Sequence, residues 1–234
     1  MPSSRVFDED ALNAGDFSEW MTSIEKALHG TDASNVPCGE CTACCTSSQF
    51  IHIEPHETAT LKRIPKKLLF AAPGLPKGNM VMGYNERGHC PMFKNGECSI
   101  YEHRPRTCRE YDCRVFPAAG TTPEKVAIGE QVARWEFAYT DERAKQQHIA
   151  IQRAATYLRQ NPEIISDERS LSNPAELAVL AIAVHDHFIA DTETETGTTT
   201  HNATDDPKGS ATPDQNALRQ AIATFTASNR TSPR

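Results

Sequence analysis

Apolar side chains with a helical period mark three segments of the chain. In residues 17–28 they recur every three or four positions, which predicts an amphipathic helix, and Asp16 with Glu19 forms a capping-box pattern at its start. Residues 141–160 and 173–190 carry the same period and predict two further helices, each beginning after a good capping residue. The expected buried positions of the three helices are Trp20, Ile24, Ala27 and Leu28, then Ala144, His148, Ile151, Ala155 and Leu158, and finally Leu177, Leu180, Ala181, Val184 and Phe188.

Strand signals are short and lie in the first half of the chain. Residues 50–53 and 80–82 are apolar runs bounded by turn residues, so each predicts a short strand. Residues 90–101 predict a hairpin, because the dipeptide Asn95-Gly96 is the one most typical of a two-residue β-turn. A proline at the first helical position predicts a helix over residues 55–64. The pattern therefore predicts a mainly α protein with short strands.

Composition limits how much of the 234-residue chain is folded. The hydrophobic fraction is 38%, below the roughly 45–50% that is usual for globular domains. Residues 1–15 are polar, and residues 191–234 open with a Thr/Asp/Gly tract that buries too little apolar area to fold. We therefore expect a flexible N-terminus at 1–15, a single domain at 16–190 and a disordered tail at 191–234, with at most a weak helix at 215–224.

All eight cysteines lie within one window of 76 residues. Four are compressed into residues 38–45 as C-x2-C-x2-C-C, and four are spread over residues 90–113. Two groups of four thiols, each short enough to surround an ion, predict a metal or iron–sulfur site. We expect a small irregular α+β cysteine module at 36–118, packed against a helical part at 119–190. The predicted ligands are Cys38, Cys41, Cys44, Cys45, Cys90, Cys98, Cys108 and Cys113.

A disulfide framework is the main alternative to metal binding, because the number of cysteines is even. Disulfides need an oxidising compartment, and the first ten residues lack the apolar region of a secretory signal. No run approaches the roughly 18 apolar residues that span a bilayer. We therefore expect a cytoplasmic protein with reduced thiols and no membrane partner.

The spacing of the cysteines leaves the metal open. Residues 38–44 match the opening of the bacterial ferredoxin run, whose fourth ligand is remote and often followed by proline, as Cys90 is. Zinc is the other candidate, since eight thiolates make two closed tetrahedral sites. We favour an iron–sulfur cluster or iron, because two structural zinc sites more often repeat a C-x2-C pair. Adjacent side chains diverge, so Cys44 and Cys45 are expected to serve two sites or to bridge two metals.

The charged residues indicate less about function than the cysteines do. A net charge of −7 argues against nucleic acid as the main partner, because phosphate binding needs a dominant basic surface. Arginines near the second cysteine group favour ion pairing with thiolates and carboxylates, and the alternative is a site for an anion or a cofactor carboxylate. This basic strip comprises Arg104, Arg106, Arg109 and Arg114. With eight thiols available, no histidine ligand is expected among His52, His56, His89 and His103.

The cysteines and their neighbours resemble the YkgJ-type cysteine-cluster family, described as a zinc- or iron-chelating domain with a C-x2-C-x2-C-C signature. The resemblance covers about residues 36–118. It is carried by the eight cysteines together with Pro91-Met92-Phe93, Gly96-Glu97, Ser99-Ile100-Tyr101, Arg104-Pro105 and Arg109.

The same domain occurs in flagellin lysine N-methylases, where it is taken to hold an iron–sulfur cluster used with S-adenosylmethionine. The resemblance therefore implies two classes of function. The first is a metal-binding protein, and the second is a protein-lysine methylase in which Arg104, Arg106 and Arg109 meet the cofactor carboxylate. Those enzymes are longer, and this chain lacks the glycine-rich strand-to-helix fingerprint of an ordinary methyltransferase. The resemblance implies the metal more directly than it implies a reaction.

Overall fold

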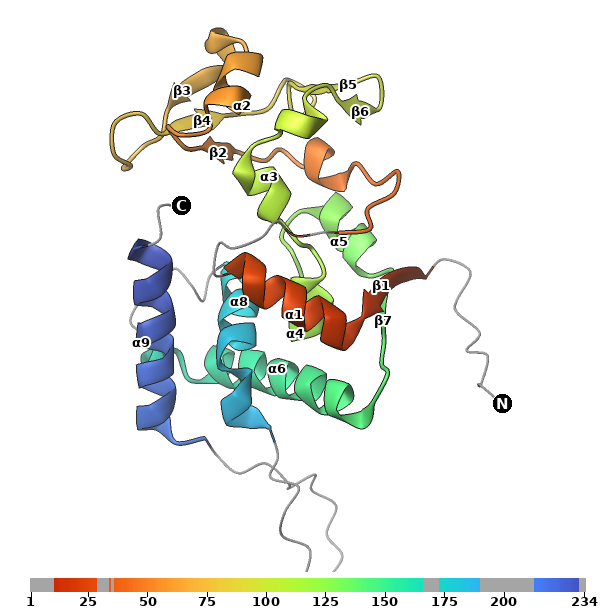
Figure 1. Ribbon diagram of the computed structural model, residues 1–234, viewed down its shortest axis with the longest axis vertical. Coiled ribbons are helices and arrows are strands. Elements are labelled where there is room, and N and C mark those ends of the chain that lie inside the picture. Colours follow the sequence, from red (N-terminus) through yellow and green to blue (C-terminus); the bar gives the residue numbers. More distant parts are fainter. Residues whose placement is uncertain (1–10, 29–33, 35, 166–172, 190–212, 232–234) are drawn as a thin grey trace, which may run out of the picture.

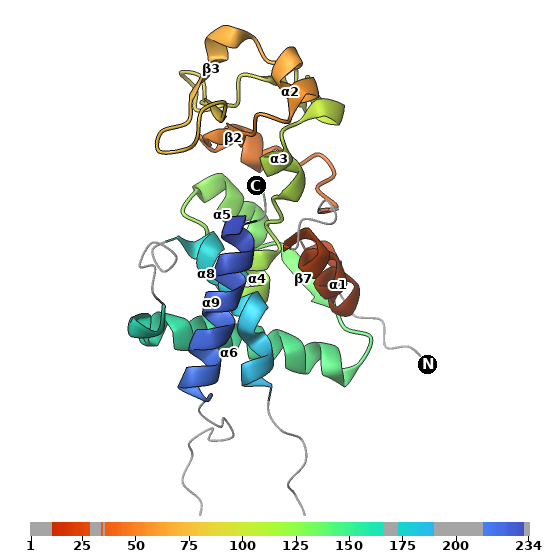
Figure 2. The ribbon, with the colours of Figure 1, turned by 60° about the vertical axis from the view of Figure 1, so that its left-hand side comes forward.

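The computed structural model describes residues 11–28, 34, 36–165, 173–189 and 213–231. Two stacked parts are visible in Figures 1 and 2: an upper part of short strands and turns, and a lower part of helices. The main hydrophobic core lies among the helices, and a second, smaller one lies beneath the strands. The expectation of a mainly α fold with short strands is confirmed. No helix in the described ranges is long and apolar enough to cross a membrane.

The N-terminal strand corrects the expectation of a flexible segment at 1–15. β1 (Leu12–Asp16) pairs in parallel with β7 (Trp135–Ala138), and Ala14 within it is completely buried. A strand so placed satisfies its backbone groups on a distant partner, which local composition cannot show. Residues 1–10 lie outside the described ranges.

The predicted amphipathic helix is confirmed as α1 (Phe17–Leu28). The Asp16 side chain caps it, because Oδ1 accepts hydrogen bonds from the backbone N–H groups of Ser18 and Glu19 at 3.0 and 3.1 Å. The apolar face of α1 packs on the main core together with the aromatic residues of β7.

The helices of the lower part form the main core. The two long predicted helices are confirmed as α6 (Glu142–Gln160) and α8 (Pro174–Val184). The helix α8 ends earlier than expected, because the chain tightens there into the 3₁₀ turn η5 (His185–Phe188). Buried alanines line the contact between α6 and α8, which lets the two backbones approach closely. The remaining short elements of this part are α4 (Val115–Ala119), α5 (Val126–Val132) and the 3₁₀ turn η4 (Pro162–Ile164).

A C-terminal helix corrects the expectation of a disordered tail at 191–234. Helix α9 (Gln215–Thr231) lies beside α8 in both Figures 1 and 2, and its Leu218 and Ile222 are buried. The physical reason lies in α8, whose buried residues are nearly consecutive and therefore need cover on more than one side. Residues 190–212 and 232–234 fall outside the described ranges.

The upper part contains a three-stranded antiparallel sheet in the order β2-β4-β3. The predicted strands at 50–53 and 80–82 are confirmed as β2 (Ile51–Ile53) and β4 (Met80–Met82), and β3 (Leu69–Ala71) completes the sheet. The helix expected at 55–64 begins later, as α2 (Thr58–Arg63), because residues 54–57 form a turn in which the backbone N–H of Glu57 donates to Glu54 O. The short 3₁₀ turns of this part are η1 (Ala43–Thr46), η2 (Lys66–Leu68) and η3 (Tyr101–His103).

The predicted hairpin is confirmed. β5 (Phe93–Lys94) pairs with β6 (Glu97–Cys98) around the dipeptide Asn95-Gly96. Both turn residues have positive φ, 54° and 87°, which is the left-handed conformation that a type I′ turn requires. From this hairpin the chain passes through α3 (Arg106–Glu110) down to the helical part.

We expect Leu218→Ala to destabilise the protein by about 2–4 kcal/mol, because it opens a cavity at a completely buried position between α9 and α8. The exposed neighbour Gln220→Ala serves as the control and should change the free energy of unfolding by less than about 0.5 kcal/mol. Urea unfolding of both variants measures this. Equal stability of the two variants would mean that α9 does not dock.

Acid is expected to destabilise the protein through His148. Burial lowers the pKa of His148 from its usual 6.5, while Phe17 stacks on its ring at 4.7 Å and Tyr139 Oη lies 2.5 Å from its Nδ1. The unfolded chain therefore binds a proton at His148 that the folded chain resists, so stability is lost as pH falls below about 6.5. Urea titrations between pH 7.5 and pH 5 should show a steeper loss for the natural protein than for His148→Gln, by up to about one proton.

Candidate metal centre

The eight cysteines come from six different local structures. Cys38 and Cys41 lie in the loop before η1, and Cys44 and Cys45 lie in η1 itself. In the second group, one cysteine lies in a turn, one on β6, one on α3 and one between α3 and α4: Cys90, Cys98, Cys108 and Cys113 respectively. All eight are free thiols. Cys113 is the one whose whole residue is buried, and Cys38, Cys44 and Cys108 are exposed as residues, although the thiols of Cys44 and Cys108 themselves lie among many neighbouring atoms.

Backbone hydrogen bonds join the two cysteine segments. The N–H of Cys90 donates to the carbonyl of Cys45 at 2.7 Å, and the N–H of Ser48 donates to the carbonyl of Gly88 at 2.8 Å. The N–H of Phe93 in turn donates to Cys90 O at 2.9 Å, and Phe93 pairs with Cys98 across the hairpin. Residues about 50 positions apart in the sequence are thereby held in one small region.

The electrostatic neighbours of the thiols define a first cysteine group: Cys38, Cys41, Cys44 and Cys113. Burial raises the pKa of the Cys44 thiol, and negative charge on Cys113, Cys38 and Cys41 raises it further, in that order. The pKa of Cys38 is also raised, by burial and then by Cys41. The pKa of Cys113 is raised to about 11, by burial first and then, more weakly, by charges that include Cys38 and Cys41.

A second cysteine group comprises Cys45, Cys90, Cys98 and Cys108. Burial raises the pKa of Cys45 to about 11, and the strongest charged neighbours are Cys90 and then Cys98. Burial likewise raises the pKa of Cys108 to about 12, with Cys90, Cys45 and Cys98 as further causes. The adjacent residues Cys44 and Cys45 therefore interact most strongly with different sets of thiols.

Across the described ranges, no three Cys, His, Asp or Glu side chains are arranged so that they could already hold a metal ion. The donor set fits zinc or an iron–sulfur cluster in number and type, since each group offers four thiols. Because the pKa values of Cys44, Cys45, Cys108 and Cys113 are raised, these four thiols are protonated at neutral pH, so a bound ion would have to displace protons and draw the sulfurs together.

Cys113 does not lie on the same helix as Cys108, although only five positions separate the two residues. Helix α3 instead ends at Glu110, and Tyr111 is extended, with φ −68° and ψ 115°. The chain turns away there because Asp112 is anchored elsewhere, so Cys113 is carried to the first cysteine group.

Asp112 is the buried anchor of this segment. Its Oδ2 accepts hydrogen bonds from Trp20 Nε1 at 3.1 Å and from Ser34 Oγ at 2.7 Å. The guanidinium of Arg114 forms a buried ion pair with it at 2.7 Å and also donates to Ala14 O at 3.0 Å. Arg114 therefore serves ion pairing, as the interpretation of the basic strip predicted.

Trp135 is a site residue that the sequence did not reveal. Its indole Nε1–H donates to Cys113 Sγ at 3.2 Å, and both residues are buried. This hydrogen bond lowers the pKa of Cys113 and partly opposes the effect of burial. Trp135 lies 22 positions from Cys113 and belongs to no recognisable motif, so the sequence pattern gives no indication of this contact.

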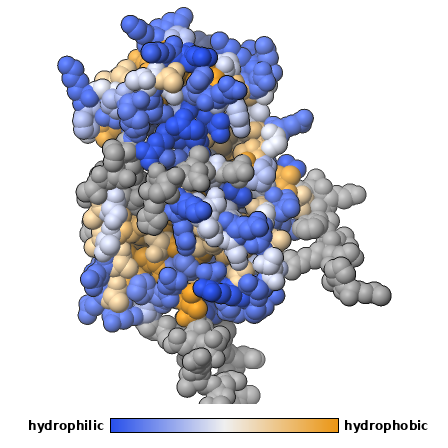
Figure 3. Space-filling view, in the orientation of Figure 1, coloured by the Kyte–Doolittle hydropathy of each residue, from blue (hydrophilic) through white to orange (hydrophobic). Residues whose placement is uncertain are grey.

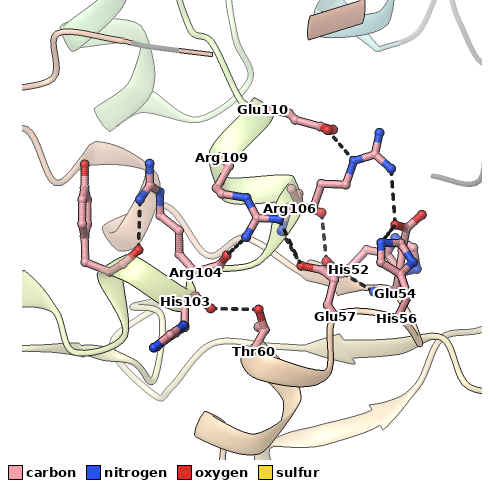
Figure 4. Close-up of polar contacts among 12 residues, drawn as sticks. His52, Glu54, His56, Glu57, Thr60, His103, Arg104, Arg106, Arg109 and Glu110 are labelled. Carbon is pink, nitrogen blue, oxygen red and sulfur yellow. Dashed lines mark hydrogen bonds and ion pairs between the residues drawn. The ribbon is translucent and has the colours of Figure 1, made fainter. Parts of the chain in front are cut away.

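Three arginines of the basic strip form hydrogen bonds or ion pairs with other groups of the protein (Figure 4). Arg106 forms ion pairs with Glu110 and, at 3.4 Å, with buried Glu54. Arg109 Nη1 donates to Arg104 O at 2.7 Å, and its Nη2 lies 3.9 Å from Glu57.

The guanidinium of Arg104 stacks on the ring of Tyr101, 4.1 Å from its centroid, and donates to Tyr101 O. The contacts of Arg106 and Arg109 support the interpretation as structural ion pairs, and those of Arg104 are with Tyr101. His52 and His56 also contact protein groups, Asn79 at 2.9 Å and Glu54 at 3.4 Å.

Two groups of four thiols on a turn-rich scaffold define a cysteine-rich, metal-chelating class of domain. Residues 37–146 match the model of the CxxCxxCC family, whose description is "putative zinc- or iron-chelating domain". The match agrees with the family that the cysteines resemble, and the matched segment includes β7 with Trp135. No curated protein and no solved structure matches the chain.

We expect Trp135→Phe to raise the pKa of Cys113 further, because the lost N–H group favours the thiolate. Alkylation of the metal-free protein with iodoacetamide across alkaline pH, followed by mass spectrometry of the Cys113 peptide, measures this shift. Glu136→Gln is the control on the same strand, since its side chain is exposed on the opposite face of β7 from Trp135. A Cys113 titration that is the same in both variants would contradict the role of Trp135.

Proposed function

We propose that this protein binds two metal centres, one in each cysteine group. The observation that carries the proposal is the divergence of two consecutive residues. The Cys45 carbonyl accepts a hydrogen bond from the N–H of Cys90 at 2.7 Å, and Cys90 and Cys98 raise the pKa of Cys45 more than Cys41 and Cys38 do, whereas Cys113 is the thiol that most raises the pKa of Cys44. A single site would bring both thiols to the same neighbours. The first centre would be held by Cys38, Cys41, Cys44 and Cys113, and the second by Cys45, Cys90, Cys98 and Cys108.

For the first centre we favour an iron–sulfur cluster over zinc. The three ligands in residues 38–44 keep the spacing of the ferredoxin run, which takes a remote fourth thiolate. The remote ligand proposed here is Cys113, in place of Cys90 with its following proline. The second centre lacks such a run and would take iron or zinc through four thiolates. A cluster would supply electron transfer, whereas zinc would supply structural stability.

Two further expectations about function concern the compartment of the protein and the methylase alternative. Free thiols throughout the cysteine module suit the cytoplasm that the sequence led us to expect. The methylase alternative stays a prediction of the family resemblance, because Arg104, Arg106 and Arg109 contact groups of the protein itself. None of these contacts favours a cofactor carboxylate.

Anaerobic purification followed by metal analysis and a visible spectrum tests the proposal. Two centres predict metal bound by all eight thiols, and an iron–sulfur cluster adds sulfide and a broad visible absorption that zinc lacks. Zinc without sulfide would keep the two centres and overturn the preference for a cluster. Protein that stays free of metal under these conditions, with all eight thiols titratable, would overturn the proposal itself.

We expect single substitutions at the two adjacent cysteines to remove different metals. Cys44→Ser should lose the first centre and Cys45→Ser the second, because each deletes one of four ligands. The double variant Cys44→Ser/Cys113→Ser should resemble Cys44→Ser alone, whereas Cys44→Ser/Cys45→Ser should lose both centres. Metal-to-protein ratios measure all four variants.

His56→Ala is the control for these variants, since this exposed side chain contacts Glu54 and is not a predicted ligand. Its metal content should equal that of the natural protein. If Cys44→Ser and Cys45→Ser lose the same metal, the two thiols bridge one centre and the division into two groups is wrong.

A further inference from the structure

The outward face of the upper sheet carries aromatic rings that the described residues leave partly exposed. His52, Phe70 and Val81 are paired across the three strands, so their side chains share one face. The alternate positions, among them Ile53 and Met82, point to the opposite face and are buried in the smaller core. The first face is therefore the solvent face of the sheet.

Three large aromatic side chains gather on and beside this face. Phe50 is 62% exposed, and Phe70 and Tyr84 are each 44% exposed. The Phe50 ring lies 6.3 Å from Phe70, edge to face, and 5.2 Å from Tyr84, measured between centroids. Gly83 lies against them, since a Cβ there would stand 3.5 Å from Phe50 and 3.7 Å from Phe70. We call Phe50, Phe70 and Tyr84 the aromatic platform.

The platform continues into a hollow of about 730 Å³. Tyr84 forms one wall, and Arg87, His89 and Phe93 line the rest together with polar side chains. The His89 and Phe93 rings meet edge to face at 6.0 Å. Through Tyr84, the aromatic platform and the hollow therefore form one surface that offers both rings and hydrogen-bonding groups.

The charge around this surface is opposite in sign to that of the whole chain. Residues 58–94 contain seven Lys or Arg and a single acidic residue, Glu86, although the net charge of the protein is −7. All seven cations are exposed, and none of them forms an ion pair with the described part of the chain. They are Lys62, Arg63, Lys66, Lys67, Lys77, Arg87 and Lys94.

Four of these cations lie next to the platform in the chain or in space. Lys66 and Lys67 directly precede β3, Lys77 lies in the loop between β3 and β4, and Arg87 shares the hollow with Tyr84. In Figure 3 the upper part is largely hydrophilic, with apolar areas confined to small patches. The partner that fits must therefore be anionic and must also offer flat apolar surfaces.

We propose that the aromatic platform and its cations bind single-stranded nucleic acid. Bases stack on exposed rings and phosphates pair with Lys and Arg, and a β-sheet face bearing aromatic side chains is a common scaffold for this. The net charge of −7 does not exclude such binding, because charges more than about 8 Å away are screened at physiological salt.

A membrane surface is the main competing partner, since it also attracts aromatic and basic side chains. The structure favours nucleic acid over it for two reasons. Phe70 lies on the face of the sheet and meets Phe50 edge to face, and the three rings come from three separate segments of the chain, not from one loop tip. The adjoining hollow is lined by Asn85, Arg87 and Asn95, which suit the edges of bases and not acyl chains.

Fluorescence anisotropy with a labelled oligothymidylate and a labelled oligouridylate of about 12 nucleotides tests the proposal on the metal-loaded full chain. Binding should be measurable at about 50 mM NaCl and weaken strongly at about 200 mM. Phe50→Ala and Tyr84→Ala should each weaken binding by about 5- to 100-fold, the effect of one lost base stack. The double variant Lys66→Ala/Lys67→Ala should reduce the salt dependence by about one unit of slope.

Tyr101→Ala is the matched control, because Tyr101 is 63% exposed but stacks with Arg104 away from the platform. It should bind like the natural protein. Thermal unfolding and metal content verify that every variant is folded. If Phe50→Ala does not fold, the double lysine variant still tests the proposal. Equal weakening by Tyr101→Ala, or no binding to either oligonucleotide at low salt, would overturn the proposal. Binding only to vesicles of about 30% phosphatidylserine would assign the surface to a membrane instead.

Discussion

The buried carboxylate of Asp112 connects the two parts of the molecule. It accepts hydrogen bonds from Trp20 on α1 and Ser34 before the first cysteine segment, and it pairs with Arg114 at the start of α4. Burying an ion pair is costly unless its remaining hydrogen-bonding capacity is satisfied, and removing one partner of such a pair typically costs about 3–5 kcal/mol. Here the surrounding donors satisfy Asp112, and Arg114 also reaches β1. The course of the chain from α3 to α4, and hence the position of Cys113, follows from this anchor.

Metal binding and folding are coupled in the cysteine module for a related reason. The module has a small core of five buried apolar residues and many turns, so its apolar burial is limited. The pKa values of Cys45 and Cys108 are raised, and no three potential ligands among the described residues are arranged so that they could already hold a metal ion. Binding free energy in such domains is also folding free energy. The backbone bond from Cys90 to Cys45 and the hairpin bring the ligands near one another, and the metal would supply the rest.

Charge is distributed along this chain in a way that its net value hides. Arg106 and Arg109, near Cys108, form ion pairs with Glu54, Glu57 and Glu110. The lysines of the upper sheet have no such partners among the described residues. The same residue types therefore serve structure in one place and leave a binding surface in another. The difference depends on which side chains the fold places within about 4 Å, and not on composition.

The sequence by itself predicted three of the helices, the hairpin and the family that the cysteine module resembles. The apolar period predicted α1, α6 and α8, because one buried face suffices to specify such helices. Asn95-Gly96 predicted the hairpin, because few other residues accept positive φ. The cysteine spacing predicted the family.

Only the tertiary structure decided the rest. β1 and α9 form because distant partners, β7 and α8, cover them, and local composition contains no information about those partners. The division of the cysteines between two groups depends on the turn after α3, and the Trp135 hydrogen bond to Cys113 depends on β7 lying beside that turn. Spacing along a chain limits which residues can meet, whereas long-range packing selects which of them do.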